Sequence, residues 1–231
     1  KINILDTPGH KDFIEDTFRT LTAVDSVIVV IDVAKGVEEQ TEKLVEVCRI
    51  RNIPIIIFIN KLDREGKDAF DLLDEVEQKL KLTVTPLSLP IGMGYNFKGI
   101  YNIWENNIQL FQDEQKQIIG NKVVFDFLED PNLEISIGRE SLEILREELE
   151  LIKAVYSPFE QKAYLEGKLQ PVLFGSALNN FGVEELLNCF IEIAPEPLPK
   201  QSEQRTIQPN EKKFSGFVFK IHANMDPNHR D

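Results

Sequence analysis

Three short polar motifs carry the side chains whose types and spacing could support chemistry. They lie at residues 6–10 (Asp-Thr-Pro-Gly-His), 60–63 (Asn-Lys-Leu-Asp) and 175–177 (Gly-Ser-Ala), each directly after an apolar run. Carboxylates, amides and glycines that allow a close backbone approach are groups that bind polar ligands and anions. Each motif alone is typical of an ordinary turn, but the three in this order predict one shared site.

The first motif has the features of an anion and metal site. Pro8 and Gly9 impose a turn after Leu5, because proline fixes its backbone angle and glycine takes angles that other residues avoid. We therefore expect Leu5 to close a strand and Asp6 to stand at the carboxyl edge of a parallel sheet, where ligands lie. This arrangement suits a phosphate and its Mg²⁺ ion, although an Asp before a turn can also be a simple turn-former.

The second and third motifs suit a purine base. Asp63 can accept two parallel hydrogen bonds from the N1–H and 2-amino groups of guanine, while the Asn60 amide serves the other edge of the base and holds the loop. Adenine lacks this donor pair, and sites built to hydrogen-bond a group reject analogues without it by about four to five decades. The stem of Lys61 can lie on the ring face, and the small residues at 175–177 would let a backbone amide approach the guanine oxygen.

Strands and helices in alternation must position these motifs. The predicted strands are 26–32 and 54–60, both continuous runs expected to be covered on both faces, and 170–174. The predicted helices are 11–21, 38–51, 68–82 and 183–191. This alternation predicts an α/β fold with a parallel sheet and flanking helices, whose strands end at one edge.

The domain organisation follows from changes in the pattern. We expect a main domain over 1–194, interrupted at about 83–167 by an α+β insert of short strands with one helix over 141–154. Residues 195–213 are rich in proline without an apolar period and predict a linker. Residues 214–221 alternate apolar and polar side chains, which predicts the first strand of a β-barrel domain at 214–231 whose remainder is absent.

Composition excludes several classes of protein. The net charge of -13 argues against general attraction to nucleic acid, though a nucleoprotein could still be contacted through a local patch. Cys48 and Cys189 lie far apart, which indicates neither a disulfide framework nor a zinc site, and Cys48 is expected to be buried. No apolar run is long enough to span a bilayer, so we expect a cytoplasmic protein that does not contact membranes.

The motifs together resemble those of the translational GTPase family. Residues 6–10 resemble its switch II motif, 60–63 its guanine-specificity motif and 175–177 the loop that closes over the base. Within the family, residues 16–25 and 217–231 are most similar to the bacterial class II peptide chain release factors. The resemblance covers almost the whole chain.

The resemblance implies a P-loop-GTPase-like fold, GTP or GDP with Mg²⁺ as ligands, and specific roles. Asp6 would hold Mg²⁺ through water, Pro8 and Gly9 would lie at the γ-phosphate, and His10 would orient the attacking water. The implied base site consists of Asn60, Lys61, Asp63, Ser176, Ala177 and Leu178. The implied partners are the ribosome and class I release factors, which such a protein removes after peptide release, with no sequence-specific nucleic acid.

Other interpretations remain open at this stage. An elongation factor G-like factor or a tetracycline ribosomal protection GTPase has the same chemistry, and the insert resembles that of the larger translocation-type members. A binding module with a degenerate G domain belongs to a different class. An adenine-nucleotide enzyme is disfavoured by Asp63.

The sequence departs from the family in having no G-x-x-x-x-G-K-[ST] loop, which the family places upstream of the strand with which this sequence begins. That loop supplies most of the attraction for the β-phosphate. We therefore expect residues 1–231 alone to bind GTP poorly and to hydrolyse none. Titration with a fluorescent GTP analogue measures this, and a micromolar affinity would refute it.

Overall fold

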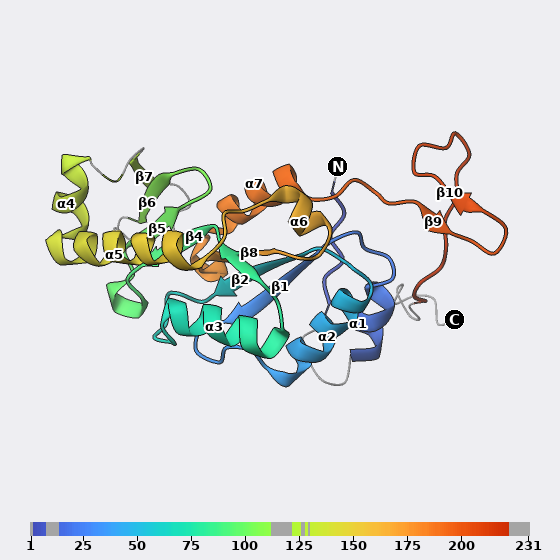
Figure 1. Cartoon of the computed structure of the whole chain (residues 1–231), viewed down its shortest axis with the longest axis horizontal. Helices are drawn as coiled ribbons and strands as arrows, with labels where there is room; N and C mark the ends of the chain where they lie inside the picture. The colour runs from blue at the N-terminus through green and yellow to red at the C-terminus, as the bar shows by residue number, and fades with distance from the viewer. Residues whose placement is uncertain (1, 8–13, 112–121, 126–127, 129, 222–231) are drawn as a thin grey trace, which may run out of the picture.

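A four-stranded parallel sheet forms the centre of the protein in a computed structural model, which describes residues 2–7, 14–111, 122–125, 128 and 130–221 (Figure 1). Its strands are β1 (Val27–Asp32), β2 (Ile55–Asn60), β8 (Gln170–Phe174) and β3 (Val84–Pro86), in the order β1-β2-β8-β3. The register pairs Asp32 with Asn60 and Ile59 with Phe174, so three strands end together at one edge. This confirms the predicted α/β class and the strands at 26–32, 54–60 and 170–174.

Helices cover both faces of this sheet (Figure 1). On one side lie α1 (Ile14–Thr20), α2 (Glu39–Ile50) and α3 (Ala69–Leu80), and on the other lie α6 (Gln161–Leu165) and α7 (Val183–Ile193). All but the short α6 were predicted from the sequence, and α7 ends two residues beyond its predicted end at 191.

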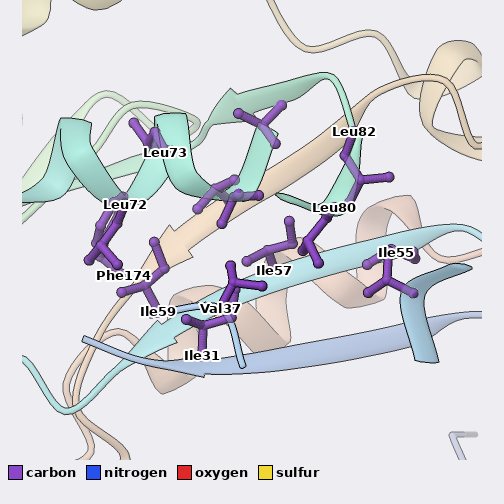
Figure 2. Close-up of a cluster of buried hydrophobic side chains, with 14 of the residues drawn as sticks. Ile31, Val37, Ile55, Ile57, Ile59, Leu72, Leu73, Leu80, Leu82 and Phe174 are labelled. Atoms are coloured by element: carbon purple, nitrogen blue, oxygen red, sulfur yellow. The ribbon is translucent and has the colours of Figure 1, made fainter. Parts of the chain in front are cut away.

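The side chains of β2 alternate between these two helical layers. Figure 2 shows Ile55, Ile57 and Ile59 packed against leucines of α3, whereas Ile56 and Phe58 pack against α7. All five are buried, so β2 is covered on both faces as predicted. The strand that ends in the second motif is therefore held on every side.

Two predicted features of the N-terminal part are wrong. Residues 2–7 form no regular structure, so no strand closes at Leu5, and Ile4 is 80% exposed. An extended run stays a strand only when a neighbouring strand takes up its backbone groups, and none in the described chain does so. In addition, β1 is an edge strand of the described sheet, and Ile28 and Val30 are exposed on the face that α7 leaves open.

The insert is an antiparallel sheet backed by helices. Its strands are β4 (Ser88–Ile91), β5 (Gly99–Asn102), β6 (Asn107–Phe111) and β7 (Lys122–Phe125), followed by α4 (Pro131–Ile137) and α5 (Arg139–Val155); the turn η2 (Gly94–Asn96) joins β4 to β5. The predicted stripe of Leu142, Leu145, Leu149 and Ile152 is buried against the sheet. The sequence reading missed α4, which is capped by Asp130 and has a proline in its first turn. β3 lies inside the predicted bounds of the insert yet pairs with β8 in the main sheet.

The C-terminal segment differs from its prediction. Within the expected linker, β9 (Lys200–Gln201) and β10 (Thr206–Ile207) form a small hairpin. Residues 214–221 form no strand, and Phe214 is 100% exposed, because no partner strand pairs with them in the described chain. The assignment of 214–231 to a β-barrel domain stays a prediction, and 222–231 lie outside the described residues.

Cys48 is buried, as predicted, and Cys189 is buried as well. Burial raises the pKa of the Cys48 thiol to about 11 and that of Cys189 to about 12, so neither forms a reactive thiolate near neutral pH.

Among the described helices, none has the length and apolar character required to cross a membrane.

Glu148 of α5 generates a testable pH dependence. Burial, together with the negative charge of Asp68 at the start of α3, raises the pKa of Glu148 to about 7. A raised pKa contributes stability that is present below the unfolded value, about 4.3, and is lost as the pH rises through the folded value. Between about pH 5 and pH 8 we expect wild type to lose on the order of 2 kcal/mol more unfolding free energy than Glu148→Gln.

Urea unfolding at several pH values measures this difference. Glu147→Gln, at an exposed position on the same helix, is the matched control and should keep the wild-type slope. Equal pH slopes for wild type and Glu148→Gln would contradict the prediction.

Candidate functional site

Two loops meet at the carboxyl edge of the parallel sheet. One begins at Asn60, the last residue of β2, and carries Lys61 and Asp63; the other follows β8 and continues into the short turn η3 (Ala177–Asn179). Because β2 and β8 are adjacent parallel strands, their ends lie side by side. The second and third predicted motifs are therefore brought together by the sheet itself.

The Asn60 carboxamide joins the two loops. Its Oδ1 accepts hydrogen bonds from the backbone amides of Lys61 and Ala177, both at 2.8 Å. The Leu62 amide adds a 3.2 Å hydrogen bond to the Gly175 carbonyl. The Asn60 carboxamide thus holds its own loop, as expected from the sequence, and also the loop of the third motif.

Asp63 faces the same loop. The hydroxyl of the buried Ser176 donates a hydrogen bond to Asp63 Oδ1. Arg64 Nε lies 3.9 Å from Asp63 Oδ2, but the Arg64 side chain is 63% exposed, and ion pairs of this kind are weak. A carboxylate has about four lone-pair positions, so Asp63 can still accept two parallel hydrogen bonds from a ligand.

Lys61 is held by an acid that the sequence reading did not assign to the site. Its Nζ donates to Asp32 Oδ2 at 2.6 Å, while its backbone adopts the left-handed region with a φ of 73°. Burial would raise the pKa of Asp32, but the hydrogen bonds from Lys61 and from the amides of Ala34 and Lys35 outweigh it and lower that pKa. The ionised Asp32 fixes the head of Lys61 and leaves its apolar stem along the loop.

A hollow of about 430 Å³ lies between the two loops. It is lined by Asn60, Lys61, Asp63, Arg64, Ala177 and Leu178. Leu178 is 79% exposed, and its side chain and the Lys61 stem are apolar parts of a lining that also contains the Asp63 carboxylate. A flat aromatic ring with two adjacent donors on one edge fits this distribution of groups, and guanine is such a ring.

Two residues at this edge were given no role from the sequence. Asp32 ends the predicted strand 26–32, whose end was expected at this edge, and the structure places it there. Arg64 also lines the hollow, but its position directly after the second motif was the only feature of the sequence that connected it with the site.

The first motif is not part of this assembly in the described chain. Asp6 is exposed and forms no hydrogen bond or ion pair with described residues, while Pro8, Gly9 and His10 lie outside them. No group of acidic, histidine or cysteine side chains able to hold a metal occurs among the described residues. One carboxylate is too small a donor set for Mg²⁺.

The fold and the comparisons define the class of protein. The parallel sheet with its covering helices is consistent with the GTP-binding domain of a translational GTPase. Residues 1–196 match the family model described as the Elongation factor Tu GTP binding domain, and the chain belongs to this family. Guanine nucleotides, with Mg²⁺, are the ligands of this family.

A solved structure shows the same fold. The protein ttk003000868 from Thermus thermophilus superposes with a TM-score of 0.61 and 23% sequence identity over 83% of this chain. The matched region is 30% of the length of that protein. At this identity the likeness concerns the fold alone.

The junction at Asn60 generates a stability prediction. Asn60→Ala removes the acceptor of two backbone amides, and losing intramolecular hydrogen bonds of this kind costs about 1–2 kcal/mol of unfolding free energy. The control is Asn179→Ala, whose side chain makes only a long 3.4 Å contact to Ser176 and should lose less than about 0.5 kcal/mol. Urea unfolding measures both variants, and equal losses would argue against the junction.

Proposed function

We propose that the hollow between the two loops binds the guanine base of GTP or GDP. The observation that carries this proposal is the convergence of Asn60, Asp63 and Ser176 from segments far apart in the sequence. In the proposed complex, Asp63 accepts the N1–H and 2-amino hydrogens, the Lys61 stem and Leu178 flank the ring, and the Ala177 amide lies near the guanine oxygen. The Ser176 hydroxyl holds the Asp63 carboxylate in place.

For the whole protein we propose a ribosome-dependent GTPase of translation termination, similar to release factor three. It would remove class I release factors from the ribosome in the cytoplasm. Family membership supports the GTPase part, and the similarity of residues 16–25 and 217–231 to class II release factors supports the termination part. Asp6, Pro8, Gly9 and His10 retain their proposed roles at Mg²⁺, the γ-phosphate and the attacking water.

An elongation factor G-like translocation or ribosomal protection factor is the second candidate, supported by the insert between the second and third motifs. The full-length protein distinguishes the two in parallel assays of release-factor recycling and of translocation on purified ribosomes. Activity in recycling alone supports the termination role, and activity in translocation alone refutes it.

Base selectivity tests the proposed site directly. Asp63→Asn exchanges one acceptor oxygen for a donor, so the variant side chain matches the N1–H and 2-oxo edge of xanthine instead of guanine. We expect wild type to prefer guanosine over xanthosine and the variant to reverse this preference, with a combined change of at least about tenfold. NMR titration of the labelled chain with each nucleoside measures the weak affinities.

Two comparisons make that titration decisive. Asp71→Asn, at an exposed position on α3, should keep the wild-type preference. Binding of adenosine as strong as that of guanosine, or an unchanged preference in Asp63→Asn, would refute the guanine assignment.

A further inference from the structure

Three phenylalanines join the insert to the loop that follows β8. Phe97 and Phe111 belong to the antiparallel sheet region, and Phe181 lies just beyond η3. The rings of Phe111 and Phe181 are stacked, with centroids 3.6 Å apart and planes 22° apart. Phe97 stacks near both, with centroids 5.7 Å from Phe111 and 5.6 Å from Phe181. All three rings are half-buried, so the stack is a packed contact between two parts of the fold.

Phe181 is also the residue that closes the loop around Ser176. The Ser176 amide donates to the Phe181 carbonyl at 2.8 Å, and the Phe181 amide donates to the Ser176 carbonyl at 2.9 Å. The loop is tight, because a Cβ added at Gly175 would lie 2.3 Å from the Phe181 carbonyl oxygen. Holding the Phe181 ring therefore also holds the main chain that presents Ser176 and Ala177.

The insert contacts the other base loop as well. The amide of Gly94, in η2, donates a 2.9 Å hydrogen bond to the carbonyl of Leu62, which lies between Lys61 and Asp63. The Leu62 side chain is fully buried. One inserted subdomain thus contacts both loops that line the hollow.

We propose that the insert sets the geometry of the base site, with Phe111 and Phe97 as positioning residues that act through Phe181. The proposal rests on the proposed function, since it names what holds the guanine-binding loops in register. Neither phenylalanine lines the hollow, so their effect on the base passes through the loop that carries Ser176.

We call the stack of Phe97, Phe111 and Phe181 the brace. Amide hydrogen exchange tests, without any nucleotide, whether the brace holds the loop that carries Ser176. Phe111→Leu keeps an apolar side chain but removes the stacked ring, and we expect the Ser176 and Phe181 amides to exchange at least about tenfold faster, with β2 amides unchanged. Phe111→Tyr keeps the ring and should restore wild-type exchange. Phe159→Leu removes a half-buried ring that packs on Trp104 elsewhere and should leave the loop amides unchanged.

The outcomes of this experiment are distinct. Faster exchange confined to the loop supports the brace. Unchanged loop exchange in Phe111→Leu, or an equal acceleration throughout the chain, overturns it.

A second measurement connects the brace to the base. NMR titration compares guanosine with inosine, which lacks only the 2-amino group that faces Asp63. We expect Phe111→Leu to reduce the guanosine-to-inosine affinity ratio at least about threefold, whereas a purely structural role would leave the ratio of the folded molecules unchanged. If wild type shows no preference for guanosine, the proposed function fails while the exchange result still decides the brace.

Discussion

The hydrogen bond from the Ala177 amide to the Asn60 carboxamide joins loops that are 117 residues apart in the sequence, and the candidate site depends on it. The bond exists because β2 and β8 pair in parallel and end at the same level of the sheet. β2 is buried on both faces, so its end cannot shift without disturbing the core. The packing of β2 in the core therefore fixes the distance between the two loops of the candidate site.

The sequence predicted the fold correctly where the apolar pattern of an element matches the way its side chains are buried. The continuous run of β2 is covered by helices on both sides, and the stripe on α5 is buried as its spacing indicated. β1 has the same kind of run but lies at the edge of the described sheet, with Val30 exposed. An apolar run shows that a strand can be buried on both faces, but its burial depends on whether other elements pack against those faces. The runs at 2–5 and 214–221 failed to form strands for the same reason.

The candidate site was predictable where strand ends carried the functional residues. Asn60 and Ser176 could be placed together because parallel strands share one edge, and Asp63 followed from its motif. The strand ends placed Asp32 at the site edge, but its ion pair with Lys61 and the stack of Phe111 on Phe181 depend on side-chain directions that the sequence pattern does not specify. Both contacts join elements that are far apart in the sequence.

A crystal structure of this chain with guanosine tests the central claim most directly. The account predicts that the base occupies the hollow between the Lys61 stem and Leu178, with the Asp63 carboxylate within hydrogen-bond distance of N1 and the 2-amino group. It also predicts that Asn60 still joins the two loops. A base bound elsewhere, or bound in the hollow with its donor edge turned away from Asp63, would contradict the account.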